Sequence, residues 1–423
     1  MSATALTALK DMWQLRKAKA AVSVVAAALI VFVIFQIEAA GALPGWLAGL
    51  VVEPLSSMWN RPMDVVQSII DGTMAGLMYS LVALGFALIY KASGVFNFAQ
   101  GIMVVFAVLA MINLEKGYSI NLWWFFGIAL VIVGAILLTG KVKTKGKSRA
   151  GSGSIVGGVL LAVVTAIFGL QAFVTISMNV WLAIPATIAI MIVLAFLVER
   201  LVLRPMVGQD EIILFMATIG LFFFLEGFGE TIFGGNNQAV PAAALGIEKG
   251  PLHLFGGNLK GGLTLQKVDL TAALSSGAMV VLLAVLFQKT TVGRALRAVA
   301  DDHQAALSVG IPLSSMWVVV WSVAGVVALV AGIFWGISGG AASFALAIIA
   351  LKALPVLILG GFTSVPGVIV GGFIIGVGEK IAELYWGDFF GGSIEEWFAF
   401  VLALAILLFR PQGLFGEKII ERV

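Results

Sequence analysis

The chain has 423 residues, of which 61% are hydrophobic and only 11% are charged. Soluble domains are about 45–50% apolar and about 25% charged, so this composition excludes a soluble protein and indicates an integral membrane protein. The small net charge of +3 argues against a nucleic-acid partner, and a chain with no cysteine and only two histidines, His253 and His303, gives no predicted metal site.

The amino end carries basic residues before an apolar run from Ala21 to Ile37. Such a run is typical of a signal peptide or of a first membrane span, and its length favours a retained span at 20–39. Region 1–60 is therefore predicted to be an amino-terminal extension with one extra transmembrane span.

Further apolar runs, bounded by charged or turn residues, follow along the chain. A helix that crosses the hydrocarbon needs about 20 apolar residues, and the short alternating segments of a strand barrel are absent from the sequence. We therefore predict an all-α, polytopic transmembrane helix bundle of about twelve spans. Their approximate limits are 20–39, 63–90, 98–113, 121–139, 153–177, 180–203, 211–233, 268–287, 316–338, 345–359, 367–386 and 396–409.

The basic residues orient these spans. If the amino end is cytoplasmic, most of the 25 lysines and arginines fall on the cytoplasmic side, as short cytoplasmic loops require. Both termini are then cytoplasmic. The basic loop TGKVKTKGKSRAGSG at 139–153 lacks the glycine that a phosphate-binding loop needs five residues before Gly146, because Lys141 stands there. It is predicted to join the two spans of a transmembrane hairpin within 121–179.

Two glycine-rich stretches, YKASGVFNFAQG at 90–101 and LGGFTSVPG at 359–367, interrupt the apolar runs on the predicted cytoplasmic side. Broken helices at membrane depth offer backbone groups to small polar solutes, so we expect broken or re-entrant helices here. An ordinary tight loop is the alternative. The polar side chains of interest are Asn97, Gln100, Thr363 and Ser364.

Charges inside predicted spans are costly when they face lipid, so each must face a partner, a cavity or an interface. They are Glu226, Glu230 and Lys352, with Glu379 or Lys380 as further examples. A role in transport competes with an internal ion pair, for example between Lys352 and the carboxylates of the 211–233 span. Glycines four residues apart, as at Gly372 and Gly376, instead predict close helix packing.

The segment 288–315 is predicted to be the longest ordered cytoplasmic segment between spans. Its apolar residues recur on one helical face, with Gly310 and Pro312 ending the helix. That face comprises Val292, Ala295, Leu296, Val299, His303, Ala306 and Leu307, whereas Arg294, Arg297, Asp301 and Gln304 point elsewhere. A helix lying on lipid should be rich in Lys and Arg, so the acidic pair Asp301 and Asp302 favours docking to a partner protein over lipid contact.

Six motifs, taken together and in order, resemble the permeases of branched-chain amino acid ABC importers of the Liv H-like type. They are GTMAGLMYSLVALGFALIYKASGVFNFAQG (72–101), VERLVLRPM (198–206), ATIGLFFFLEG (217–227), TVGRALRAVADDHQAALSVGI (291–311), LKALPVLILGGFTSVPGVIVGG (351–372) and RPQGLFG (410–416). The resemblance covers most of 65–416. Gln100 stands where the family's motif carries histidine.

The resemblance implies a pore subunit of the bacterial inner membrane that moves branched-chain or related amino acids. It implies no catalysis and no cofactor in this chain, with ATP and magnesium bound by partner ATPases. The implied partners are two ATPase subunits, a second permease subunit, a periplasmic substrate-binding protein and membrane lipid. The implied ATPase-coupling residues are Arg294, Arg297, Asp301, Asp302, Gln304 and Gly310.

Region 61–120 then forms the first part of the permease core and 180–423 the remainder, with 1–60 and 121–179 as additions. Candidate pathway residues are Asn97, Gln100, Glu226, Glu230, Lys352, Thr363 and Ser364. Similar permeases serve urea, short amides or aromatic acids, which leaves the substrate open. An ion-coupled secondary transporter, using the buried charges, and a channel or membrane scaffold are the other classes.

Overall fold

The computed structural model describes residues 44–416 except 95, 118–176, 207–208, 255–261 and 302. The predicted spans 20–39 and 121–139, and all but the last residue of 153–177, lie outside these residues, as does most of region 1–60. The described part is mostly helical, with one small antiparallel hairpin of strands. That hairpin is the departure from the all-α prediction.

Six helices of the described residues are long and apolar enough to cross a membrane, which confirms a polytopic membrane protein. Each coincides with a span expected from the sequence. They are α4 (Pro62–Ser93), α8 (Val180–Val198), α9 (Glu211–Phe233), α10 (Lys267–Lys289), α13 (Leu313–Ser338) and α16 (Val365–Phe390). A π-helical turn, η2 (Glu199–Leu203), and a 3-10 turn, η3 (Arg204–Met206), continue α8.

Three further expected spans are short or broken. Helix α5 (Gln100–Lys116) has 17 residues and α17 (Ile394–Phe409) has 16. The span expected at 345–359 consists of α14 (Leu346–Ile349) and α15 (Ala353–Gly360), separated by the 3-10 turn η4 (Ala350–Lys352). This interruption places Lys352 at the junction of two short helices.

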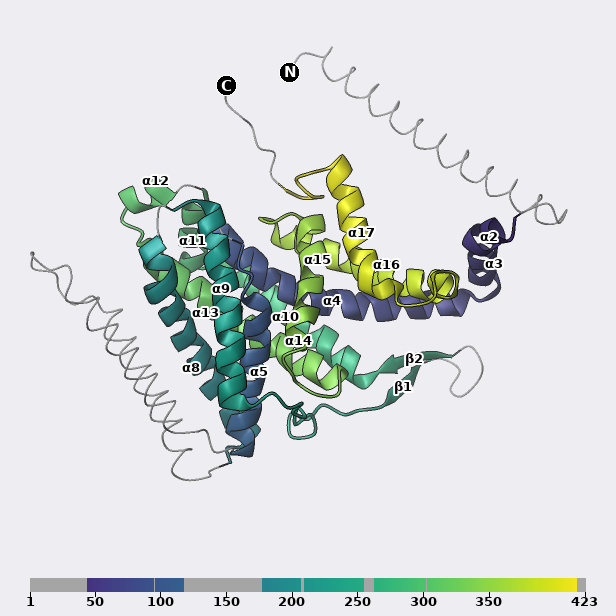
Figure 1. Ribbon diagram of the computed structural model, residues 1–423, viewed down its shortest axis with the longest axis horizontal. Coiled ribbons are helices and arrows are strands. Elements are labelled where there is room, and N and C mark those ends of the chain that lie inside the picture. The colour runs from purple at the N-terminus through teal and green to yellow at the C-terminus, as the bar shows by residue number, and fades with distance from the viewer. Residues whose placement is uncertain are drawn as a thin grey trace, which may run out of the picture.

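Helix α5 forms the centre of the core. Nearly all of its residues are buried, and it packs against α8, α9, α13 and α14. Figure 1 shows α5 next to α9. A helix that is apolar on every side is suited to such a position because no face of it requires water.

Among the described residues, helices α4 and α16 form the most extensive contact between two elements, and they lie side by side in Figure 1. Glycines on both helices allow this approach: a Cβ atom on Gly76 would collide with the Gly372 carbonyl, and one on Gly72 would collide with the backbone of Gly376 and Val377. The prediction that the pair Gly372 and Gly376 serves helix packing is confirmed.

The remaining elements lie at the ends of the bundle. At the predicted outer side, β1 (Pro251–Leu254) pairs with β2 (Leu263–Gln266), and the hairpin projects from the body in Figure 1. The Gln67 side chain holds it to α4 by accepting from Thr264 N at 2.9 Å and donating to Thr264 O at 2.6 Å. The short helices are α2 (Gly45–Leu47), η1 (Ala48–Val52), α3 (Glu53–Asn60), α11 (Thr291–Asp301) and α12 (His303–Ser308).

Candidate functional site

The two glycine-rich interruptions meet in the fold although they are far apart in the sequence. Lys91 Nζ, in the last turn of α4, donates to the Thr363 carbonyl at 3.3 Å. The rings of Tyr90 and Phe362 lie 5.1 Å apart between centroids. The predicted cytoplasmic ends of α4, α15 and α16 are therefore joined at one place.

Local contacts explain the polar residues of the first interruption. Gly94, with φ of 70°, ends α4 in the left-handed conformation that favours glycine. Asn97 Oδ1 then accepts from Ala99 N at 3.1 Å, and Thr218 Oγ1 of α9 accepts from Phe98 N at 3.1 Å. Protein groups thus satisfy this irregular backbone. Thr218 was not among the expected site residues, and nothing in its local sequence marks it.

Gln100, the first residue of α5, is fully buried. Its Nε2 donates to the Ala324 carbonyl of α13 at 3.2 Å, while its Oε1 has no hydrogen-bond partner among the described residues. The Gln100 amide also fills the space that a Cβ on Gly85 would take. Gln100 therefore fixes the start of α5 against both α13 and α4.

Hydrogen bonds within the chain satisfy the second interruption, at 359–367. Ser364 Oγ accepts from Gly367 N at 3.1 Å, which caps the amino end of α16. The closing motif of the chain completes the turn, because Leu414 N donates to Leu359 O at 2.8 Å and Phe415 N donates to Gly360 O at 3.3 Å. For Thr363 and Ser364, the described contacts are those of a tight loop.

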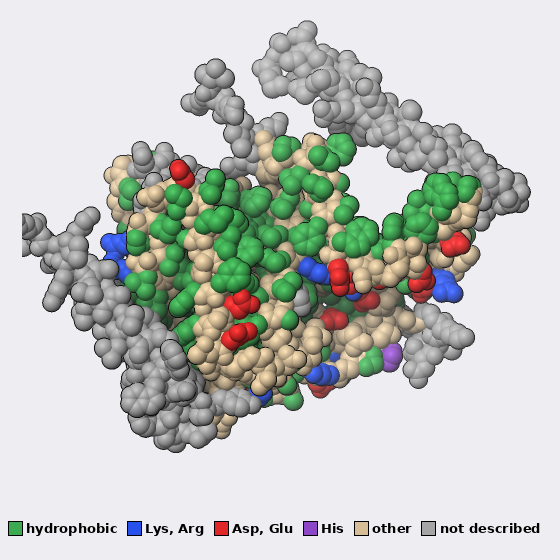
Figure 2. All heavy atoms as spheres, in the orientation of Figure 1, with side chains coloured by type: hydrophobic (Ala, Val, Ile, Leu, Met, Phe, Trp, Pro, Cys, Tyr) green, Lys and Arg blue, Asp and Glu red, His purple; other side chains and the backbone are tan. Residues whose placement is uncertain are grey.

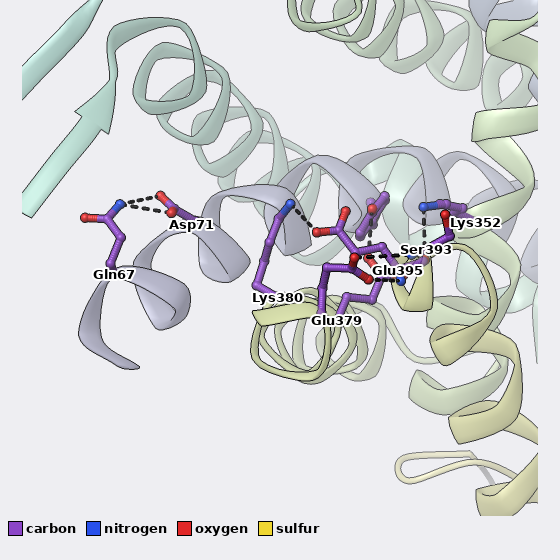
Figure 3. Close-up of polar contacts among 9 residues, drawn as sticks. Gln67, Asp71, Lys352, Glu379, Lys380, Ser393 and Glu395 are labelled. Atoms are coloured by element: carbon purple, nitrogen blue, oxygen red, sulfur yellow. Dashed lines mark hydrogen bonds and ion pairs between the residues drawn. The ribbon is translucent and has the colours of Figure 1, made fainter. Parts of the chain in front are cut away.

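A cluster of charged side chains lies where η4 meets α16 and α17 (Figure 3). Lys352 Nζ donates to the carbonyl oxygen of Glu395 at 3.1 Å, and Lys380 Nζ lies 2.7 Å from Glu395 Oε1. All three side chains are half-buried. Glu383 completes the cluster by accepting from Ser393 N and Glu395 N, each at 3.2 Å, at the amino end of α17.

Glu379 is the most deeply buried member of this cluster, with 1% of its surface exposed. Its Oε2 accepts from the Tyr79 hydroxyl of α4 at 2.9 Å, while Oε1 has no hydrogen-bond partner among the described residues. The nearby Lys352 ammonium offsets part of the cost of burying this carboxylate. The sequence marks Glu379 as an intramembrane charge, but its partnership with Tyr79 follows only from the packing of α16 on α4.

Glu226 and Glu230 share one face of α9, as their spacing predicts. Glu226 is half-buried and Glu230 is exposed. In Figure 2, acidic side chains lie among hydrophobic ones on the face of the molecule that is in view. The alternative of an ion pair with Lys352 is wrong, because the Lys352 ammonium lies with Glu395 and Glu379 instead.

Within the polar segment 288–315, the structure describes the helices α11 and α12 on either side of residue 302, which lies outside the described residues. Leu296, Val299 and Ala306 are buried as predicted. Leu307 was expected on the same face but is 52% exposed, and Val309 beside it is 74% exposed. The expectation is wrong for Leu307, which lies one residue before the end of α12 at Ser308, where the residues of the following turn are exposed as well.

The two arginines of α11 have different surroundings. Arg294 is exposed, whereas Arg297 is half-buried and donates through Nη1 to the Phe287 carbonyl at the end of α10. Arg297 therefore bonds the backbone of its own chain, a contact that the helical periodicity does not specify. An arginine beside free carbonyls at a helix end is favourable because its charge complements the helix dipole. Gly310, with φ of 84°, supplies the left-handed turn after α12.

Long apolar helices, a broken helix and charges held in the interior define a membrane protein of the solute-permease class. A model of the family described as "Branched-chain amino acid transport system / permease component" matches residues 68–410. The chain belongs to this family. Membership confirms the resemblance drawn from the six motifs and agrees with a transport component that is not itself an enzyme.

Three relatives are similar over most of the chain. The high-affinity branched-chain amino acid transport system permease protein BraD of Pseudomonas aeruginosa is 24% identical over 359 residues, covering 85% of this chain and 98% of BraD. The permease proteins LivH of Salmonella typhimurium and of Escherichia coli K12 are each 22% identical, over 363 and 368 residues, covering 85% of this chain and 97% of each relative.

Proposed function

We propose that this chain forms one half of the pore of an ABC importer that carries branched-chain or related amino acids across the bacterial inner membrane. The family match over 68–410 carries this proposal. The names of its relatives support the amino-acid substrate. The distribution of basic residues supports both termini on the cytoplasmic side.

The ATPase docks, in this proposal, on α11 and α12 within the segment 288–315. The buried side of α11 packs on α4, α10 and α13, whereas Arg294, Leu307 and Val309 are exposed. Exposed apolar and cationic groups beside each other suit a protein partner. Because α11 contacts α4, which also packs on α16, a displacement of α11 would reach the helix pair that contains Tyr79 and Glu379.

The other partners follow from the same class. A second permease subunit completes the pore, and a periplasmic binding protein delivers the substrate at the outer side. ATP and magnesium belong to two ATPase subunits, and membrane lipid covers the remaining apolar surface. Among the described residues, exposed apolar side chains on α10 and α17 support extensive lipid contact.

Partly or fully exposed charged side chains are the best-supported candidates for the substrate pathway. Lys352 is half-buried at a helix break, and Glu230 is exposed on α9. Glu226 lies on the same face. We give Asn97, Gln100, Thr363 and Ser364 a supporting role in the proposal, because their described contacts hold the ends of α5 and α16.

Gentle purification of the tagged chain tests the class. An ABC permease should bring an ATPase subunit with it, and uptake of leucine, isoleucine or valine should stop when ATP is depleted. Uptake that instead stops with a proton ionophore while ATP is intact would support the ion-coupled alternative and overturn the proposal. Competition by urea, acetamide or an aromatic acid, in the absence of competition by leucine, would reassign the substrate within the class.

A further inference from the structure

The predicted cytoplasmic end of the bundle contains a cavity of about 310 Å³. It lies where the ends of α4 and α10 meet α11, the start of α16 and the closing loop of the chain. Small-molecule sites begin at roughly this size, about 300 Å³. The cavity therefore has room for a small metabolite.

Two cations face this cavity, Lys91 from α4 and Arg297 from α11. No carboxylate lines it among the residues that the structure describes. Each cation donates to one neutral carbonyl, Lys91 to Thr363 and Arg297 to Phe287. A lysine carries three donors and an arginine five, so both retain donors for a further acceptor.

Helix termini provide the alternative explanation of these cations. Lys91 lies in the last turn of α4, and Arg297 bonds the end of α10, so each complements the negative end of a helix. That role uses only part of their hydrogen-bonding capacity. The amino end of α16, at Val365 and Pro366, opens on the same cavity and adds the positive end of a third helix.

The rest of the cavity wall is apolar. Leu88, Phe287, Leu296 and Phe415 line it, with Ala284 leaving space on the α10 side. An anionic group near two cations, beside an apolar wall of this size, describes a small carboxylate with a short hydrocarbon side chain. A bare inorganic anion would leave the apolar wall without contact.

We infer that this cavity binds a small aliphatic carboxylate from the cytoplasm, its carboxylate on Lys91 and Arg297 and its hydrocarbon against Leu88 and Phe287. Resting on the proposed function, we assign the ligand's effect as inhibition: such a carboxylate, once inside the cell, occupies the cavity between α11 and α16 and slows further transport. The ligand would then link the proposed ATPase-docking helix to the α4 and α16 pair.

Direct binding tests the site without transport. The full chain in nanodiscs of neutral phosphatidylcholine is titrated with 4-methylpentanoate, with L-leucine and with L-leucinamide, which lacks the carboxylate. We expect 4-methylpentanoate to bind more tightly than L-leucine, whose ammonium group meets two cations and no carboxylate in the described lining, and leucinamide not to bind. Lys91→Gln and Arg297→Gln should each weaken binding roughly tenfold, the effect of losing one charge-assisted hydrogen bond. Arg294→Gln, an exposed change on the same helix, should leave binding unchanged.

Ala284→Leu keeps both cations but fills the apolar part of the cavity, so it should also weaken 4-methylpentanoate binding. This variant keeps the test valid if a charge variant fails to fold. No saturable binding by the parental chain, or equal binding by Ala284→Leu, would overturn the site. If phosphatidylglycerol, and not 4-methylpentanoate, is the species whose binding depends on Lys91 and Arg297, the cavity holds a lipid headgroup and the inference is wrong.

Leucine uptake by the reconstituted importer tests the inhibition. With 4-methylpentanoate inside the vesicles, leucine uptake by the parental importer should fall, and the ratio of inhibited to uninhibited uptake should return toward one in Ala284→Leu. An unchanged ratio in this variant would overturn the inhibition. Absence of leucine uptake by the parental importer would reject the proposed function, whereas the nanodisc binding would still decide the site.

Discussion

The Tyr79 hydroxyl of α4 donates to Glu379 Oε2 of α16 at 2.9 Å, across 300 residues of sequence. Both residues lie near the middle of their helices and both are buried. A carboxylate buried in this way is costly unless a donor or a cation compensates it. This pair therefore depends on the close α4–α16 contact and also reinforces it.

Tyr79→Phe should destabilise the protein by about 1–3 kcal/mol, because it leaves Glu379 without its hydroxyl donor. Thermal unfolding of the purified chain in detergent measures the change. Glu379→Gln removes the charge that needs compensation, so the further loss caused by Tyr79→Phe in the Glu379→Gln background should be smaller. Equal losses in both backgrounds would show that the two side chains are not coupled.

Gly76→Leu should prevent tight packing of α4 on α16, because even a Cβ at this position would collide with the Gly372 carbonyl. The expected cost is about 1–3 kcal/mol or more, seen as loss of monodisperse folded protein on size exclusion. Gly220→Leu is the matched control, since a Cβ there meets nothing within 4 Å. A Gly76→Leu chain as stable as the control would contradict the role of this contact.

The two arginines of α11 should respond differently to charge reversal. Arg294→Glu changes an exposed charge, so the chain should keep its stability while less ATPase copurifies. The loss of binding free energy should be about 2–5 kcal/mol if the contact is buried in the complex. Arg297→Glu should lower the stability of the isolated chain, because its bond to the Phe287 carbonyl is lost. If Arg294→Glu copurifies like the parent, α11 does not contribute this contact.

The predicted hairpin within 121–179 can be tested by deletion. Met178 N donates to Leu114 O at 3.1 Å, so the chain segments on both sides of 118–176 are already in contact. Replacing 118–176 with a short linker should leave the orientation of all later helices unchanged, as measured by a reporter fused after Val423. A reversed reporter would contradict a peripheral hairpin. Correct insertion and assembly without transport would assign this region to the pathway or to a partner contact.

Glu226→Gln and Glu230→Gln, made separately, test the carboxylates of α9. If they serve the pathway, at least one variant should lose uptake while ATPase assembly and substrate-free ATPase activity persist. Uptake is measured across pH after protein level and assembly have been checked. Parental rates for both variants over the whole range would remove these carboxylates from translocation.

The sequence alone determined the protein class, because hydrophobicity and span length are read from contiguous residues and do not depend on which residues meet in the fold. It likewise located the six long helices and the family, whose six motifs keep their order along the chain, whereas the interruption at Lys352 within the expected span 345–359 appeared only in the structure. The packing role of Gly372 and Gly376 also followed from spacing alone.

Tertiary structure decided what each polar group contacts. Periodicity assigned Leu307 to the buried face although its side chain is exposed, and it could not show that α10 presents the Phe287 carbonyl to Arg297. Similarly, nothing near Lys352 or Glu379 in the sequence specifies Glu395 or Tyr79 as partners. Those pairings arise where helices distant in sequence cross, and a local pattern carries no information about which residues meet at a crossing.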